Sequence, residues 1–239
     1  MTFMEFTGCA LIAFGPALTM FSMSIAHNPI FIIIMISAAF FWLLSLLLSS
    51  LLWTIVIPLK ETLVFGVVFS VLFQELFRYL FYRLLKKAEM GLKKVSEVGS
   101  GHSEYSTQWS SLSYVSGFGF GIMSGVFSMI NVLADSTGPG TVGLFGDSRY
   151  FFITSAFHTL AFVLLHTFWG IIFFHSLDSK NYLRLMIVPV SHLVVTLLTF
   201  LNQHQIYTGS LIPCYIILFV MAYLALRISQ ENNRTCGTV

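Results

Sequence analysis

The sequence contains few charged residues, and this shortage limits what kind of protein it can be. Only 9% of the 239 residues are charged, whereas 56% are hydrophobic, and the mean hydropathy is +0.85. A soluble domain needs a polar surface, which this composition cannot supply. The chain is therefore predicted to be a multi-spanning membrane protein, with lipid as the solvent for much of its surface. Its formal net charge of +2 says little about partners.

The chain also has few cysteines, and its loops carry few charges. Cys9, Cys214 and Cys236 are an odd number at wide spacing, which argues against a disulfide framework and against a cysteine-based zinc site. The N-terminus lacks the basic flank of a cleavable signal peptide, so the first hydrophobic segment is expected to be retained. Because the loops leave no room for a sizeable soluble domain, we expect residues 1–239 to form a single polytopic membrane domain.

Seven hydrophobic segments are long enough to cross a bilayer, which takes about 20 apolar residues in a helix. The predicted fold is therefore an all-α membrane protein, a bundle of seven transmembrane helices. The spans are expected at roughly residues 3–25, 30–57, 64–85, 113–134, 150–174, 183–201 and 209–228. The second span is longer than one crossing requires, which predicts that it tilts or extends beyond the membrane.

The positive charges predict which way the bundle is oriented, because cytosolic loops carry an excess of Lys and Arg. Nine of these side chains lie after the third, fifth and seventh spans: Arg83, Lys86, Lys87, Lys93, Lys94, Lys180, Arg184, Arg227 and Arg234. Only Lys60 and Arg149 lie on the other side. The N-terminus is therefore expected to be lumenal or extracellular and the C-terminus cytosolic.

The stretch GFGFGIMSG at residues 117–125 is unusually rich in glycine. Its glycine offsets miss the phosphate-binding fingerprint and no strand precedes them, so a nucleotide site is excluded. On a helix, the small and polar residues fall within one arc of roughly 120°, with large apolar residues elsewhere and Gly119 on the opposite side. The residues of this arc are Gly117, Gly121, Ser124, Gly125, Ser128, Asn131 and Asp135. Such a face is typical of close helix packing in lipid, either within the chain or against another protein.

Five ionisable side chains are predicted well inside the spans, away from their ends, where an unpaired charge is costly. They are Glu75 and Arg78 in the third span, His158 and His166 in the fifth, and His192 in the sixth. The first two are three residues apart and can pair on one helix face, either neutralising each other or contacting another subunit. The histidines have no carboxylate or cysteine with them, so no metal is expected and hydrogen-bonded packing is the favoured role.

Catalysis by this chain alone depends on whether Ser124 can act as a nucleophile. Rhomboid-type proteases use a serine in a Gly-x-Ser-Gly context with a histidine on another helix, and here the first glycine is shifted by one position. Ser124 also lies on the packing face, away from the water that a nucleophile needs. We therefore expect no catalytic residue. The alternatives are a rhomboid-like protease that pairs Ser124 with His166 or His192, and a seven-helix transporter or receptor.

Five segments carry a resemblance to a known family: GCALIAFGPA, FFWLLSLLLSSLLW, QELFRYLFYRLLKKAEMGL, YVSGFGFGIMSGVFSMINVLADSTGPGTVGLFGDS and LLHTFWG. In this order they resemble the anterior-pharynx-defective family, the seven-helix scaffold subunit of gamma-secretase. The resemblance runs almost end to end and implies a role in assembly and stability. In that family the glycine run of helix four and the histidines of helices five and six support assembly. These positions fall on Gly117, Gly121, Gly125, His166 and His192.

The resemblance also implies partners and a location. The implied partners are the presenilin catalytic subunit, nicastrin, the presenilin enhancer subunit and membrane lipids, with no nucleic acid and no cofactor. Presenilin supplies the catalytic aspartates, and the complex cleaves type I membrane proteins such as Notch and the amyloid precursor protein. The implied locations are the endoplasmic reticulum, the Golgi, and the plasma and endosomal membranes.

Overall fold

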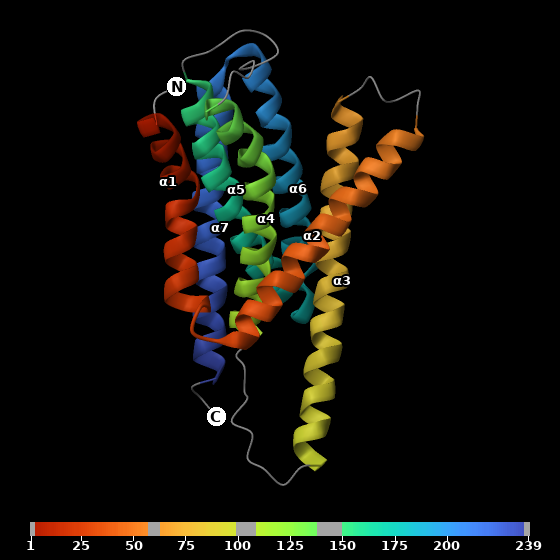
Figure 1. Cartoon of the computed structure of the whole chain (residues 1–239). Coiled ribbons are helices and arrows are strands. Elements are labelled where there is room, and N and C mark those ends of the chain that lie inside the picture. Colours follow the sequence, from red (N-terminus) through yellow and green to blue (C-terminus); the bar gives the residue numbers. More distant parts are fainter. Residues whose placement is uncertain (1–2, 57–62, 99–108, 138–149, 237–239) are drawn as a thin grey trace.

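The computed structural model describes residues 3–56, 63–98, 109–137 and 150–236, and nearly all of them are helical (Figure 1). Within these ranges the long helices are α1 (Phe3–Met20), α2 (Pro29–Ile55), α3 (Leu63–Val98), α4 (Trp109–Thr137), α5 (Phe151–Asp178), α6 (Tyr182–Leu198) and α7 (Tyr207–Cys236). A π-helix (Phe21–Ile25) follows α1, and a 3-10 helix (Thr199–His204) follows α6. The described residues contain seven helices long and apolar enough to cross a membrane. The predicted all-α, seven-span fold is confirmed.

Local chemistry sets where the helices begin. α2 starts after Asn28, whose side-chain oxygen accepts a hydrogen bond from the Ile30 amide, and Pro29 occupies the first helical position. α6 starts after Asn181, whose side chain accepts from the amide of Arg184. Between α5 and α6, Lys180 has a φ of 54°, a left-handed conformation that reverses the chain within a few residues. The short turn keeps α6 beside α5.

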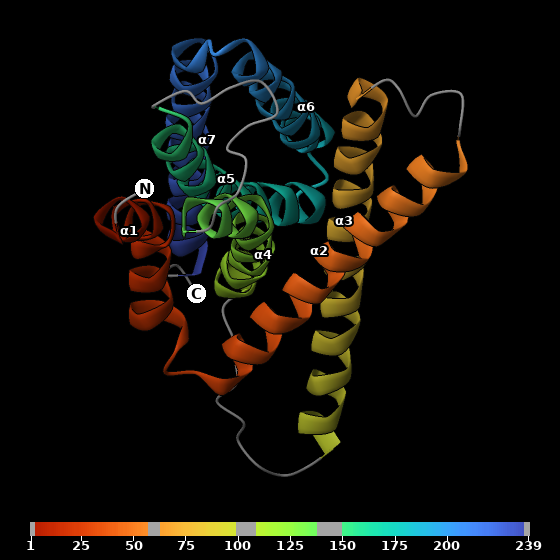
Figure 2. The same ribbon diagram turned by 45° about the horizontal axis from the view of Figure 1, so that its top comes forward.

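α5 lies inside the bundle, with α1, α4, α6 and α7 packed around it (Figures 1 and 2). Six of its apolar side chains are fully buried: Ala156, Ala161, Val163, Leu165, Trp169 and Phe174. They do not share one face of the helix, as expected for a helix that is covered on all sides. α5 is therefore the element against which the other helices are placed.

α2 and α3 stand to one side of this central group. α2 runs obliquely across α4 and α3 (Figures 1 and 2). The rings of Phe41 and Phe81 meet where it passes α3, with their centroids 5.0 Å apart. α3 continues to Val98, well beyond the predicted end at residue 85. Hydropathy marks only the lipid-embedded part, whereas the Lys-, Leu- and Glu-rich sequence that follows has a high helix propensity.

The glycine face of α4 packs against α5 of the same chain. A Cβ atom on Gly117 would lie 2.7 Å from the carbonyl oxygen of His166, and one on Gly121 would lie 2.5 Å from that of Val163. A Cβ atom on Gly170 of α5 would lie 2.6 Å from the Cα atom of Gly117. Only glycine permits two helix backbones to approach this closely. Of the two possibilities that the sequence left open, packing within the chain accounts for these glycines.

The remaining residues of the predicted face contribute less to the close packing of α4 against α5. Ser128 is exposed, but its hydroxyl lies 3.2 Å from that of Thr159 in α5. Gly125 faces the side chains of Val163 and Thr159 rather than backbone. The structure does not describe the side chains of Asn131 and Asp135.

Gly119, on the opposite side of α4, has a packing role that the sequence pattern did not predict. A Cβ atom there would come within 2.4 Å of the carbonyl oxygen of Met35 in α2, and within 2.9 Å of the Ala38 methyl group. α4 therefore uses glycine on two sides, toward α5 and toward α2.

Basic side chains from all three predicted cytosolic segments lie at one end of the bundle: Lys86, Arg184 and Arg227. Lys86 of α3 lies 3.0 Å from Asp178 at the end of α5, and Arg184 of α6 lies 3.7 Å from Glu231 of α7. The N-terminal end of α1 lies at the other end of the bundle (Figure 1). The side chains of Lys60, Lys93, Lys94, Arg149 and Arg234 lie outside the described residues.

We expect Gly121→Ala to lower the Tm of the protein. The added methyl group would meet the carbonyl oxygen of Val163, a backbone atom that cannot rotate away, so α4 and α5 would have to separate at a cost of about 1–3 kcal/mol. Tryptophan fluorescence during heating in mild detergent measures the change. Gly8→Ala is the matched control, because a Cβ atom there has nothing within 4 Å. Equal Tm values for the two variants would contradict close packing at Gly121.

Candidate functional site

Four of the five predicted ionisable residues come together in one buried polar cluster. Glu75 and Arg78 come from α3, His166 from α5 and His192 from α6, and their exposed fractions are 7%, 1%, 1% and 2%. These side chains are enclosed by protein and do not face lipid. The cluster thus joins three helices in the interior of the bundle, where such groups are tolerated in a membrane.

Arg78 makes most of the contacts in this cluster. Its Nε atom lies 3.1 Å from Glu75 Oε2 and its Nη2 atom 3.4 Å from Glu75 Oε1. The same guanidinium donates to His166 twice, from Nη2 to the ring Nδ1 atom at 2.9 Å and from Nη1 to the backbone carbonyl at 3.3 Å. Its Cζ atom also lies 5.1 Å from the ring centre of Phe120 in α4, a cation–π contact. One side chain therefore connects α3 to α4 and α5.

The two histidines of the cluster have opposite hydrogen-bonding roles. His192 Nδ1 lies 2.7 Å from Glu75 Oε1, and the carboxylate accepts there, so the ring donates from Nδ1. A guanidinium only donates, so His166 must accept at Nδ1 and carry its ring proton on Nε2. The rings lie edge to face with centroids 5.0 Å apart, and the ring of His192 lies 4.5 Å from that of Trp169. Each histidine therefore has the hydrogen-bonding role that its charged neighbour requires: His166 accepts from the guanidinium, and His192 donates to the carboxylate.

The predicted pairing of Glu75 with Arg78 is present, but the expectation that no carboxylate accompanies the histidines is wrong. Glu75 also bonds to His192, which is 117 residues away in the sequence. The spacing of residues within one helix revealed the first contact, whereas the second depends on how α3 packs against α6. In the described part of the chain, no three His, Cys, Asp or Glu side chains are placed to hold a metal ion.

His158 belongs to a separate polar contact, between α5 and α7. Its Nε2 atom lies 3.1 Å from the hydroxyl of Ser210, which donates in turn to the side-chain oxygen of Asn202. The serine has one hydroxyl proton, and both the Asn202 side-chain oxygen and the Tyr207 carbonyl oxygen, 3.0 Å away, accept from it, so His158 is the donor in the first bond. The sequence predicted His158 as a buried polar residue, but no sequence pattern identified Ser210 and Asn202 as the residues that it contacts.

Among the described residues, Ser124 has no hydrogen bond to a histidine that could act as its base. Ser124 is half-buried on α4, and neither His166 nor His192 bonds to it in the described part of the chain. The Nδ1 atoms of both histidines are engaged by Arg78 and Glu75 instead. A serine nucleophile requires a base within hydrogen-bonding reach, and this arrangement supplies none.

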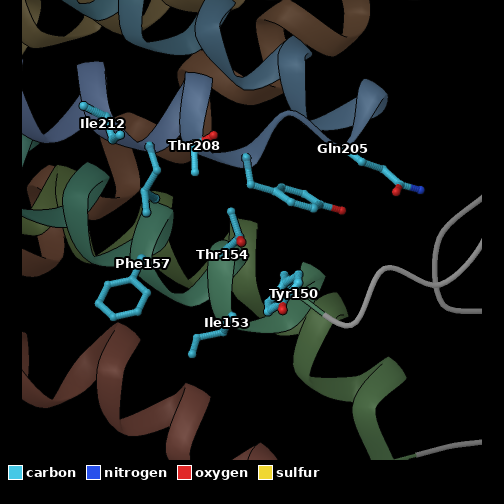
Figure 3. A pocket seen from close by; sticks show the side chains of 9 residues that line it. Tyr150, Ile153, Thr154, Phe157, Gln205, Thr208 and Ile212 are labelled. Carbon is cyan, nitrogen blue, oxygen red and sulfur yellow. The ribbon is translucent and has the colours of Figure 1, made fainter.

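A cavity of ≈490 Å³ lies between the first turns of α5 and α7 (Figure 3). The side chains of Tyr150 and Gln205 lie toward one end of it, and those of Phe157 and Ile212 toward the other (Figure 3). Its nine described lining residues are Tyr150, Ile153, Thr154, Phe157, Gln205, Tyr207, Thr208, Leu211 and Ile212. This set contains neither a carboxylate nor a histidine, so it offers no acid–base pair for hydrolysis.

Similarity to known proteins extends along nearly the whole sequence. Residues 4–232 match the protein family described as Aph-1 protein. The chain is 51% identical to gamma-secretase subunit Aph-1 of Drosophila melanogaster over 235 residues, which cover 98% of this chain and 97% of that protein. It is 50% identical to gamma-secretase subunit Aph-1b of Danio rerio over 250 residues, covering 100% and 95%. It is 47% identical to gamma-secretase subunit APH-1B of Homo sapiens over 248 residues, covering 99% and 94%.

We expect lysine to be more harmful at position 166 than at position 192. In His166→Lys, the new ammonium group would face the Arg78 guanidinium, and a buried charge without its counter-charge costs about 3–5 kcal/mol. In His192→Lys, the ammonium group would face the Glu75 carboxylate and replace the existing donor. The Tm in mild detergent should therefore fall much further for His166→Lys.

His166→Asn and His192→Asn serve as controls for this comparison, because asparagine can accept at one site and donate at the other. Both should fall between the wild type and His166→Lys. Equal Tm losses for the two lysine variants would show that the two histidines do not face opposite charges.

Proposed function

The chain belongs to the Aph-1 protein family, and we propose that it is a non-catalytic scaffold subunit of a gamma-secretase complex, required for its assembly and stability. The observation that carries this proposal is identity of about half of all residues, over nearly the full length, with proteins named as gamma-secretase subunits. The chain would therefore contribute helices and surfaces to an intramembrane protease, and another subunit would contribute the chemistry.

The partners that we propose are a presenilin, which supplies the two catalytic aspartates, together with nicastrin and the presenilin enhancer subunit. The complex would cleave type I membrane proteins such as Notch and the amyloid precursor protein. It would act in the endoplasmic reticulum, the Golgi, and the plasma and endosomal membranes. The gathering of basic side chains at one end of the bundle supports a cytosolic position for that end and a lumenal N-terminus.

The internal contacts of the polar cluster support a structural role. Glu75, Arg78, His166 and His192 bond to one another and leave no nucleophile or acid facing a substrate. The outer surface is largely apolar, with exposed side chains such as Leu11, Phe40, Ile216 and Phe219. In lipid, faces of this kind can contact either acyl chains or the helices of other subunits.

We expect Ser124→Ala to restore full activity in cells that lack their own copy of the chain. Cleavage of a Notch-derived membrane stub measures activity, and co-purification of presenilin and nicastrin in mild detergent measures assembly. Ser37→Ala on α2 is the matched serine control. His166→Lys should fail in both assays, because it damages the cluster that orders the helices.

Two outcomes would overturn the proposal. Loss of cleavage by Ser124→Ala in a complex that still assembles would place chemistry in this chain. Failure of the unaltered chain to co-purify with any other membrane subunit would remove the scaffold role.

A further inference from the structure

A groove between α2 and α3 combines apolar walls with positive charge. It has a volume of ≈710 Å³ and is lined by Phe41 of α2 and, on α3, by Leu80, Arg83, Leu84, Lys86, Lys87 and Met90. It begins where α2 passes α3 and continues along α3 toward its C-terminal end, where the two helices diverge (Figure 1).

Four of the six α3 side chains that line the groove lie on one face of the helix. Leu80, Arg83, Leu84 and Lys87 follow the i, i+3, i+4, i+7 spacing, so they line up along a single side. Arg83, Leu84 and Lys87 are exposed, and Leu80 is 42% exposed. An exposed face that alternates apolar and cationic side chains fits an amphiphile better than it fits pure hydrocarbon.

The same face continues as an apolar stripe toward the middle of the membrane. Leu76 and Leu72 precede Leu80 at intervals of four residues, with exposed fractions of 47% and 52%. The stripe from Leu72 to Arg83 is about 16 Å long at a rise of about 1.5 Å per residue. That is close to half of the hydrocarbon core of a bilayer, which is about 30 Å thick. The stripe therefore spans roughly one leaflet and ends at the cations.

The positive charge at the end of the stripe is only partly neutralised by the protein. Lys86 lies beside Asp178 and Glu89. Arg83 donates to the hydroxyl of Tyr79 at 3.0 Å, and its Cζ atom lies 5.9 Å from the centre of the same ring, so both of these contacts are with a neutral side chain and neither supplies a counter-charge. In the described part of the chain, no carboxylate lies within 4.0 Å of Arg83 or Lys87.

We propose that this groove binds an anionic phospholipid of the leaflet on the basic side of the bundle. Its phosphate lies between Arg83 and Lys87, and one acyl chain runs along Leu80, Leu76 and Leu72. The planar guanidinium group matches phosphate oxygens in a fork, and the ammonium group adds a point charge beside it. Basic pockets between membrane helices on this side are suited to anionic headgroups. The leaflet-long apolar stripe selects a lipid over a soluble phosphate compound.

The test uses the purified complex in nanodiscs of phosphatidylcholine with a minor fraction of phosphatidylserine. Native mass spectrometry after release into detergent counts the lipids of each class that stay bound. The wild type should retain phosphatidylserine preferentially. Removing both charges, in Arg83→Gln with Lys87→Gln, should lower this retention by roughly tenfold or more, with phosphatidylcholine retention unchanged. Inorganic phosphate should not compete, because it lacks the acyl chain.

The chain offers a matched control in Arg227. This arginine also donates to a tyrosine four residues earlier, Tyr223, at 2.8 Å, but the cavity beside it measures only ≈40 Å³. Arg227→Gln therefore removes an equivalent exposed charge at the same end of the bundle without touching the groove. Its lipid retention should match that of the wild type.

The apolar stripe formed by Leu80, Leu76 and Leu72 is tested separately. Leu76→Ala with Leu80→Ala should weaken phosphatidylserine retention, whereas Leu183→Ala, at a residue 82% exposed on α6, should not. Unchanged retention in the Arg83 and Lys87 double variant, or an equal loss in Arg227→Gln, would overturn the proposal. Release of another subunit instead of lipid would also overturn it, because the groove would then hold a protein segment.

Discussion

The packing of this protein depends on a guanidinium group that cannot lose its charge in the interior of a membrane bundle. Arg78 is 1% exposed, and its contacts come from Glu75 on its own helix, His166 on α5 and Phe120 on α4. Each contact compensates a different part of the group: the carboxylate balances the charge, the histidine accepts hydrogen bonds and the ring covers one face. Since α3 stands beside the central helices, this network fixes where it docks. His192 extends the network to α6 through Glu75.

The glycine contact and the polar cluster meet at a single residue. The carbonyl oxygen of His166 accepts from Arg78 at 3.3 Å, and it lies 2.7 Å from the position that a Cβ atom on Gly117 would occupy. The close approach of α4 to α5 therefore determines the surroundings of the same backbone group that receives the guanidinium. A side chain at position 117 would push α4 away from His166 and carry Phe120 away from Arg78. Glycines in one helix and charges in another thus form one structural unit, although they are far apart in the sequence.

The sequence was sufficient for the parts of the structure that depend on lipid and on short spacings. Apolar length predicted all seven spans, and the interval of three residues predicted the contact of Glu75 with Arg78. It was not sufficient where the outcome depends on which helices are neighbours. Nothing near His192 in the sequence indicates a carboxylate, because Glu75 reaches it only through the packing of α3 on α6. Gly119 was missed for a related reason: one glycine among large residues forms no periodic face, yet α2 crosses at that point.

A buried ion pair is an inefficient way to gain stability, because well-packed apolar residues of similar volume often do as well or better. Its value in this chain is specificity. Helices in lipid gain little by burying apolar surface, since acyl chains are equally apolar, so shape and hydrogen bonds must fix their positions. The glycines of α4 set the distance to α5, and Glu75, Arg78, His166 and His192 set the register of α3 against α5 and α6. A subunit of a complex needs one arrangement rather than many of similar energy, because its outer surface is built from several helices. A rigid interior therefore holds the largely apolar outer surface in one defined shape.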